Sequence, residues 1–194
     1  MSVEDPSPPM DGDTGAPGFA VFETAIGVCG LAWGPRGLVG VQLPQDDPGA
    51  HATRRRMRQR FPGLPEAVPP ADAQRAIAAV QGLLAGAHDD LGHIVLDMRG
   101  VSDFHQRVYA IARRIPPGQT RTYGEIAEEL GDKTLARAIG QAMGHNPFAP
   151  VVPCHRVLAA GNKPGGFSAG GGALTKLKML DIEGARPNGM ASLF

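Results

Sequence analysis

The stretch TYGEIAEELGDKTLARAIGQAMGH, residues 122–145, decides how the second half of the chain folds. Thr122 stands three residues before Glu125, which is the pattern of a capping box at the start of a helix. Gly131 opens a tight turn, and a second helix runs from there to His145. Helix, short glycine-containing turn and helix are the signature of a helix-turn-helix, although a plain helical hairpin shows the same pattern.

The second of these helices is unusual for its small side chains, which recur at Ala136, Ala138, Gly140, Ala142 and Gly144. Small side chains let a helix approach another surface closely. A DNA groove is one such surface, and a neighbouring helix is another.

A further helix is predicted upstream of this pair, over FHQRVYAIARRI at residues 104–115. Either Ser102 or Asp103 can cap its start, and Pro116 is the first residue of the Pro-Pro-Gly sequence that stops it. Its apolar positions follow one stripe and are Phe104, Val108, Ile111, Ala112 and Ile115.

The first half of the chain alternates short strands and helices. Three strands at 19–24, 28–33 and 38–43 are separated by tight turns and predict an antiparallel meander. Helices are predicted over HATRRRMRQRF (51–61) and over 71–86, and the segment HIVLDM (93–98) is typical of one more strand.

An arginine run lies within the helix predicted over 51–61, at Arg54, Arg55, Arg56, Arg58 and Arg60. It is either a phosphate patch or a solvated helix face, and the second is the more common use of such a run.

The composition is that of a folded protein without an overall charge. Of 194 residues, 42% are hydrophobic and 20% are charged, and 19 Lys and Arg balance 19 Asp and Glu. This excludes a uniformly basic nucleic-acid coat. Residues 1–103 hold 8 basic and 13 acidic residues, a net charge of −5, whereas residues 104–183 hold 10 and 6, a net of +4. Residues 104–183 are therefore the part of the chain that could bind phosphates. A net charge of +4 is also within the ordinary variation of protein surfaces.

Other features of the composition exclude further classes. Two cysteines, Cys29 and Cys154, make no disulfide scaffold, so we expect a reducing, cytoplasmic location. Zinc-ligand spacing is absent, so no metal is expected. No apolar run of membrane-spanning length occurs, and the acidic, Pro- and Gly-rich residues 1–18 do not have the pattern of a signal peptide. The aromatic content of 5% argues against a base-stacking platform for single strands.

Cys154 carries the pattern of a reactive cysteine. The approach NPFAPVVPCHRV (146–157) holds three prolines, which fix φ and stiffen the segment. His155 and Arg156 are polar or cationic neighbours of the kind that favour thiolate over thiol. Cys29 has no polar neighbour in its strand and fits a small buried hydrophobe.

His155 needs help to act as a base on Cys154. Adjacent side chains rarely point at each other, so we expect the contact to run through a water. A histidine base also needs an acid to fix its tautomer, and Glu183 is a candidate from far along the chain. The alternative for Glu183 is a surface glutamate at a helix end.

The stretch from Phe104 to Gly184 resembles the DNA-binding and active-site domain of the methylated-DNA–protein-cysteine methyltransferases, also called O6-alkylguanine-DNA alkyltransferases. The matching segments are IPPGQTRTYGEIA, LARAIGQAMGHNP, VVPCHRV, GGFSAGG and the closing pair Lys176 and Glu183, in the family's order and close to its spacing. Residues 19–103 resemble the family's N-terminal domain more weakly, through GLVGVQL and LDMRG.

The resemblance implies an α+β fold. A small N-terminal antiparallel sheet with helices precedes a mainly helical, winged helix-turn-helix-like DNA-binding and active-site domain. The corresponding division of the chain is a disordered tail (1–18), an N-terminal domain (19–100), the second domain (101–186) and a C-terminal tail (187–194). The resemblance also implies a monomer without a cofactor that acts on double-stranded DNA containing O6-alkylguanine, and on O4-alkylthymine too.

The resemblance assigns catalytic roles to four residues. Cys154 matches the nucleophile that takes the alkyl group, and His155 matches the water-linked base. Glu183 matches the acid that orients this base, and Tyr123 matches the hydroxyl that donates to the leaving guanine.

Six further positions match residues that bind the base or the duplex. They are Arg137, which enters the duplex where the damaged base was, the hinge asparagine Asn146, the apolar pocket wall Met143, Val157 with its carbonyl toward the guanine amine, Ser168 of the closing loop, and Lys176 of the closing pair.

The implied chemistry has a direct physical sense. An O6-alkyl group lies within the base stack, so the nucleotide must be flipped out, and Arg137 would fill the gap. The helix with small residues would enter the minor groove, which carries little sequence information. Because the product is a thioether and the chain shows no regenerating machinery, one protein molecule should repair one lesion.

This chain departs from the family's pattern at two places. Gly144-His145 stand where the family often has a basic residue, which removes one backbone contact, and the loop FSAGGGALTK (167–176) is longer than the common form.

Three other functions fit parts of the pattern. A non-catalytic lesion sensor would flip alkylguanine, but such proteins usually replace the nucleophile with tryptophan. A helix-turn-helix transcription regulator of this family would carry an extra metal-binding domain, for which this chain has no cysteine cluster. A cysteine hydrolase would need an acyl or peptide pocket, which no pattern here suggests.

Overall fold

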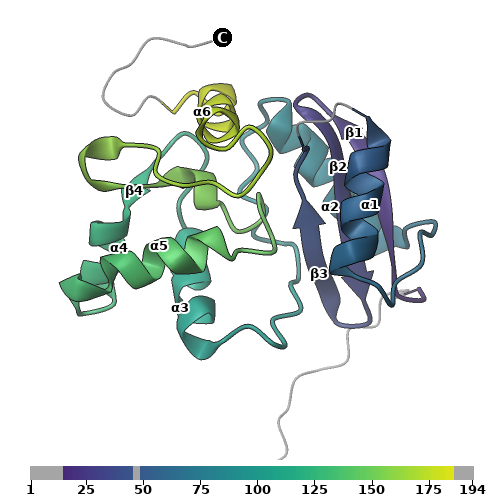
Figure 1. Ribbon diagram of the computed structural model, residues 1–194, viewed down its shortest axis with the longest axis horizontal. Helices are drawn as coiled ribbons and strands as arrows, with labels where there is room; N and C mark the ends of the chain where they lie inside the picture. The colour runs from purple at the N-terminus through teal and green to yellow at the C-terminus, as the bar shows by residue number, and fades with distance from the viewer. Residues whose placement is uncertain (1–14, 46–48, 186–194) are drawn as a thin grey trace, which may run out of the picture.

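The computed structural model describes residues 15–45 and 49–185, which form two halves lying side by side (Figure 1). One half is a sheet with helices and the other is mainly helical, so the predicted α+β fold class is confirmed. The two predicted tails lie outside the described residues, apart from residues 15–18, and the domain boundaries stay predictions.

The predicted meander is confirmed. Strands β1 (Gly18–Thr24), β2 (Gly27–Gly34) and β3 (Gly37–Gln42) form an antiparallel sheet in the order β1-β2-β3. Gly27 and Gly37 begin the second and third strands with φ values of 125° and 130°, a backbone conformation that favours glycine. These glycines therefore fix where the chain reverses.

Two helices cover the two faces of this sheet (Figure 1). Helix α1 (Ala50–Arg60) lies on one face and α2 (Ala71–Leu84) on the other. Side chains alternate along β2, so Ala32 shares a small core with Met57 of α1, while Leu31 belongs to the larger core that includes α2.

The strand predicted over 93–98 does not form. Leu38 of β3 donates its N–H to the Val95 carbonyl at 2.9 Å and accepts from Asp97 N–H at 2.8 Å, which makes a single parallel bridge to Leu96. The same edge of β3 is already used further along, where Val41 N–H donates to the Pro147 carbonyl at 2.8 Å. The edge is thus shared between two segments, and neither extends into a strand.

The second half contains the predicted helix-turn-helix pair. Thr122 and Glu125 form the predicted capping box, and Ser102 rather than Asp103 caps the upstream helix. The second helix of the pair begins as a 3-10 turn, because the Asp132 side chain accepts from Thr134 N–H at 2.9 Å. The elements are α3 (Asp103–Ala112), β4 (Arg121–Thr122), α4 (Tyr123–Glu129), η1 (Lys133–Leu135) and α5 (Ala136–Gly144).

The remaining elements close the second half. A two-residue parallel pairing of β4 with β5 places the segment after Cys154 beside the start of α4. Among the described residues, no helix is long and apolar enough to cross a membrane. The elements are η2 (Cys154–Arg156), β5 (Val157–Leu158), η3 (Ala160–Asn162) and α6 (Ala173–Ile182).

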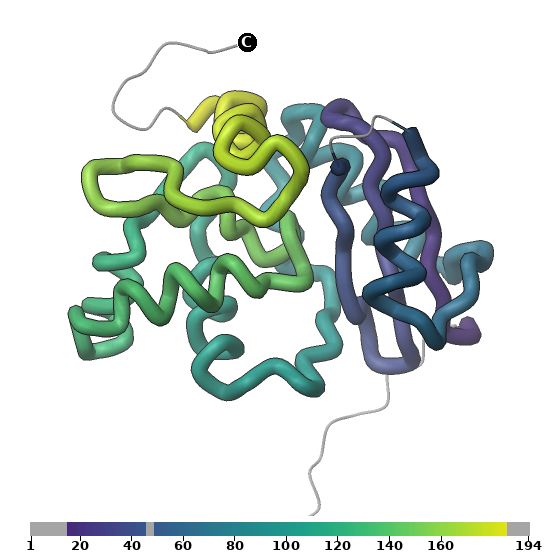
Figure 2. Tube along the Cα trace, in the orientation of Figure 1, coloured from purple at the N-terminus to yellow at the C-terminus, as the bar shows by residue number. Residues whose placement is uncertain are grey.

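The two halves share part of their core. Val151 and Met179 come from the second half but belong to the cluster that contains Leu31 and Trp33 of the sheet. Figure 2 shows the chain after α5 running to the edge of the sheet, where Pro147 binds β3. The sheet therefore supports the segment that leads to Cys154.

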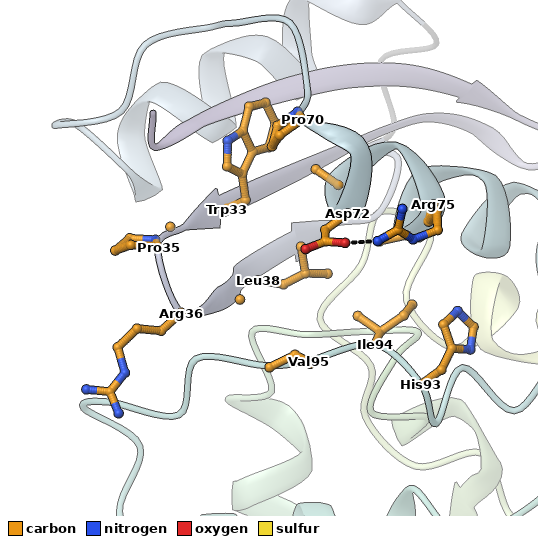
Figure 3. A pocket seen from close by; sticks show the side chains of 14 residues that line it. Trp33, Pro35, Arg36, Leu38, Pro70, Asp72, Arg75, His93, Ile94 and Val95 are labelled. Atoms are coloured by element: carbon orange, nitrogen blue, oxygen red, sulfur yellow. Dashed lines mark hydrogen bonds and ion pairs between the residues drawn. The ribbon is translucent and has the colours of Figure 1, made fainter. Parts of the chain in front are cut away.

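An apolar hollow of about 220 Å³ lies in the first half (Figure 3). Trp33, Pro70 and Ile94 line it, with an ion pair between Asp72 and Arg75 at its side. None of the residues predicted for the site lines this hollow.

Replacing Thr122 with Ala should lower the free energy of unfolding by about 1 kcal/mol, because the Glu125 N–H loses the hydroxyl oxygen that accepts its hydrogen bond, while the backbone N–H of residue 122 still donates to Glu125. Thr122→Ser retains the hydroxyl and should stay close to the wild-type protein. Urea unfolding followed by circular dichroism measures the difference. Equal stability of the Ala and Ser variants would show that the cap contributes nothing.

Candidate active site

Cys154 begins a 3-10 turn at the end of a buried approach. Val151 and Val152 are fully buried, and the Cys154 side chain is 4% exposed. Asn146 braces this approach, since its Nδ2 donates to the Val152 carbonyl at 2.7 Å and its Oδ1 accepts from Phe148 N–H at 2.9 Å. The sulfur is thus held by a stiff segment, as the prolines predicted.

The expectation that the surroundings of Cys154 favour a resting thiolate is wrong. Burial raises the pKa of this thiol above its ordinary value, and a hydrogen bond from Asn146 and the charge of Lys176 lower it only in part. Arg156, which the sequence placed beside the sulfur, binds a carboxylate instead. The sulfur therefore rests as a thiol, and a base must remove its proton.

His155, Glu183 and Arg156 form one buried cluster. His155 Nε2 lies 2.7 Å from Glu183 Oε1. Arg156 donates to the same carboxylate from Nε at 2.9 Å and from Nη2 at 2.7 Å, and its Nη1 donates to the Ile115 carbonyl at 2.7 Å. The carboxylate that the sequence expected beside the histidine is present, and it is buried rather than at the surface.

The charge of Glu183 is fixed by its partners. Burial alone would raise the pKa of this carboxyl, but the hydrogen bonds and charges of His155 and Arg156 outweigh burial and lower it to about 2. Sequence reasoning missed this role of Arg156. The available signal was that a buried glutamate needs a cation as well as a histidine.

His155 is poised to accept a proton. Burial lowers its pKa below the ordinary value, against the opposing effect of Glu183, so the ring is neutral at rest. With Nε2–H donating to Glu183, the acceptor nitrogen is Nδ1, which is buried and has no hydrogen-bond partner in the described part of the chain. Nδ1 is therefore the nitrogen through which His155 can act as a base.

Lys176 is buried within the site rather than exposed at the surface. Its ammonium donates to the Val157 carbonyl at 2.6 Å and lies about 6 Å from the rings of Tyr123 and Phe167. Burial lowers its pKa to about 8, while the nearby Cys154 favours its charged form. The Val157 carbonyl keeps a second lone pair, so its predicted contact with a guanine amine stays open.

Tyr123 is the first residue of α4 and is packed against glycines. A Cβ on Gly140 would lie 3.7 Å from its ring, and a Cβ on Gly165 would lie 3.1 Å from its hydroxyl. Burial raises the pKa of Tyr123, with a further contribution from Cys154, so its hydroxyl stays protonated. One small residue of α5 therefore serves a neighbouring ring, whereas Gly144 faces open space.

The other predicted residues divide between the core and the surface. Met143 is 4% exposed and shares a core cluster with Cys154 and Val157. Arg137 is exposed on α5, and its guanidinium has no hydrogen bond or ion pair within residues 15–45 and 49–185. Ser168 is exposed and lines a hollow together with Asn146. The functions of all these residues stay predictions.

No group of three or more potential ligands that could hold a metal ion occurs in the described ranges. The cluster around Glu183 instead pairs one carboxylate with a histidine and an arginine, and a cation as the third member is the opposite of what a metal site needs.

The stability of the fold should fall as the pH is lowered, in two stages. The folded state prefers neutral His155, so protonation of the unfolded chain begins to cost stability below about pH 6.5. Ionised Glu183 stabilises the fold fully above pH 4.5, its ordinary pKa, and this contribution is lost toward pH 2. Urea unfolding at a series of pH values measures both stages.

Glu183→Gln should reduce the second stage, because an amide does not titrate and only other carboxyls with lowered pKa values, such as that of Asp97, still contribute. It should also cost roughly 3 kcal/mol at neutral pH, since Arg156 is left buried without its counter-charge. A variant that keeps the full loss of stability below pH 4.5 would show that another carboxylate is responsible.

Comparison with known proteins gives consistent matches. The DNA-binding domain of the 6-O-methylguanine DNA methyltransferases matches residues 103–185. The methylated-DNA–protein-cysteine methyltransferase of Mycobacterium bovis is 43% identical over 123 residues, covering 58% of this chain and 73% of that protein. The DNA base-flipping protein of Thermus thermophilus is 40% identical over 125 residues, covering 64% of this chain and 82% of that protein.

Comparison of the fold with solved structures leads to the same family. A crystal structure of Mycobacterium tuberculosis OGT in complex with DNA aligns with a TM-score of 0.67 at 34% identity, covering 86% of this chain and 92% of that one. The family model spans the whole segment that holds Cys154, His155 and Glu183, and a structural alignment over 86% of the chain extends into both halves of the molecule. The chain belongs to the methylated-DNA–protein-cysteine methyltransferase family.

Proposed function

We propose that this protein, as an O6-methylguanine-DNA methyltransferase, repairs DNA by moving the alkyl group onto its own Cys154 and keeping it there. The observation that carries the proposal is the buried pair of His155 and Glu183 directly after a cysteine at the end of a stiff approach. The family supplies the activity, and the geometry supports the assignment of roles.

The first step is removal of the thiol proton. His155 Nδ1 takes it from Cys154 through one water, because adjacent side chains do not face each other. The imidazolium that forms stays next to Glu183, which Arg156 keeps ionised. A buried charge pair of this kind stabilises the proton on the histidine while the sulfur reacts.

The second step is displacement at the alkyl carbon. The sulfur lone pair forms the new S–C bond while the C–O6 bond breaks, and its electron pair passes to the guanine. Tyr123 donates its proton to the departing base, which leaves neutral, and the proton that His155 took from sulfur then returns to Tyr123 through solvent, so that the protons balance. The thioether has no route back to a thiol in this chain, so each molecule reacts once.

Base flipping follows from the burial of the nucleophile. The sulfur of a residue that is only 4% exposed does not reach an atom inside an intact duplex, so the damaged nucleotide must leave the stack. The protein accordingly binds double-stranded DNA containing O6-alkylguanine. Arg137, exposed on α5 without a partner in the described chain, is the side chain that enters the gap.

O4-alkylthymine is the second lesion that we propose. Its alkyl group is also bonded to an exocyclic oxygen next to a ring nitrogen, so the same displacement applies. The wall of the site near the sulfur includes the apolar Met143, which makes no hydrogen bond that would exclude the smaller base.

The alternative function is a lesion sensor that binds the damaged base without transferring the alkyl group, and the similarity to a DNA base-flipping protein favours it. Cys154 with a histidine and a carboxylate in reach supports transfer instead, since a sensor has no need of a buried base.

Cys154→Ser should abolish alkyl uptake. After mixing with duplex DNA containing O6-methylguanine, the wild-type peptide that holds Cys154 should gain about 14 Da, one CH2, with at most one methyl group per protein. Cys29→Ser is the matched control, because Cys29 is fully buried and burial raises its pKa to about 12. Uptake by the Cys154 variant, or several methyl groups per protein, would refute the mechanism. A duplex with O4-methylthymine tests the second lesion in the same assay.

Arg137→Ala should slow repair in duplex DNA by roughly ten- to a hundredfold, because the gap left by a flipped base is no longer filled. Transfer from the free modified base should stay unchanged. Arg36→Ala removes an equal charge from an exposed turn of the first half and serves as control. Equal slowing with duplex and with free base would exclude the proposed role of Arg137.

A further inference from the structure

A groove of about 520 Å³ joins the two halves of the molecule. In Figure 1 both α1 and α5 lie toward the viewer, and the edge strand β3 runs between them. The groove is lined by the last turns of α1, the end of β3, the end of α5 and the loop around Ser168. Its lining includes Arg56, Gln59, Arg60, Gly144, His145 and Asn146.

The charge of this groove is one-sided. Arg56, Arg60 and His145 line it, and no acidic side chain is among its described lining residues. Two other arginines of α1 are paired with a carboxylate, since Arg54 binds both oxygens of Glu66 and Arg58 lies 3.5 Å from the same carboxylate. The arginine run of α1 is therefore not a uniform solvated face.

Arg60 has a structural task. Its Nη1 donates to the Val41 carbonyl and to Gln42 Oε1, both at 2.9 Å, and its Nη2 donates to the Pro147 carbonyl at 3.3 Å. It thus fastens α1 to β3 and to the turn that follows Asn146. Burial lowers its pKa, and the like charge of Arg56 lowers it further, so the two guanidinium groups repel each other.

Arg56 has no such task. It is exposed, and the structure gives its guanidinium no hydrogen bond or ion pair within residues 15–45 and 49–185. It stands one helical turn before Arg60 on the side of α1 that faces the groove. Two neighbouring cations without a facing carboxylate make a site for an anion.

The position of the groove identifies that anion. It continues from the end of α5, where a Cβ on Gly144 would meet nothing within 4 Å, so a strand of DNA has room there. The carboxyl end of a helix carries partial negative charge and does not attract a phosphate by itself. A phosphate beside the end of α5 therefore needs a cation from another element, and α1 supplies it.

We propose that Arg56, supported by Arg60, binds a backbone phosphate of the DNA strand that passes the end of α5. The first half of the chain thereby becomes part of the DNA-binding surface, on the side where Asn146 and Ser168 line the same groove. This inference rests on the proposed function, because it assumes that α5 meets DNA.

Arg56→Ala tests the proposal, with Arg55→Ala as the matched control. Arg55 is the adjacent exposed arginine of α1 and lines a different hollow, with His51 and Arg58. Both variants lose one charge from the same helix. The measurement is binding to a duplex containing O6-methylguanine at a series of salt concentrations, with transfer from the free modified base followed in parallel.

We expect Arg56→Ala to weaken duplex binding at low salt by roughly fivefold and to reduce the slope of log K against log salt by about 0.9, the value of one phosphate contact. Arg55→Ala should leave that slope unchanged, and both variants should retain transfer from the free base. Equal effects of the two substitutions, or none from Arg56→Ala, would overturn the proposal.

The same experiment separates this inference from the proposed function. A wild-type protein that neither binds the duplex nor takes up the alkyl group contradicts both. A wild-type protein that binds and reacts, next to an Arg56→Ala variant with an unchanged salt slope, contradicts only the role of Arg56.

Discussion

The binding of the Glu183 carboxylate by both His155 and Arg156 is the constraint on which the rest of the site depends. Removing a carboxylate from water is costly, and this one is buried only because two partners satisfy its oxygens. The same contacts orient the histidine ring and leave Nδ1 as its acceptor. The cluster also connects the end of α6 to the turn that holds Cys154. Through the Ile115 carbonyl, it connects both to the segment that follows α3.

Burial sets the protonation states of Cys154 and His155. The same desolvation that raises the pKa of Cys154 lowers the pKa of His155, so thiol and neutral imidazole are the resting forms. Such a pair stays unreactive until a substrate is present, which suits the single reaction that we propose for each molecule. Lys176, also buried, adds a positive charge near the sulfur and holds the Val157 carbonyl in place.

Sequence patterns succeeded where the determinants are local. The capping box at Thr122 and the three strands depend on neighbours within a few residues, so the local pattern of residues located them. Sequence patterns failed where segments far apart in the chain compete for the same backbone hydrogen bonds. The segment 93–98 has the composition of a strand, but the edge of β3 is shared with Pro147, and no local pattern reports that competition.

The sequence by itself determined the family and the fold class and singled out Cys154 as the candidate nucleophile, because motif spacing and the stiff approach to Cys154 are properties of contiguous residues. Only the tertiary structure decided the partner of Arg156, the resting state of the sulfur and the separate uses of the α1 arginines. Each of these depends on burial and on contacts between residues far apart in the chain, such as Arg60 with Pro147 or Arg156 with Glu183. The charge and the solvation of a side chain are set by its neighbours in space, and the linear sequence does not show which residues these neighbours are.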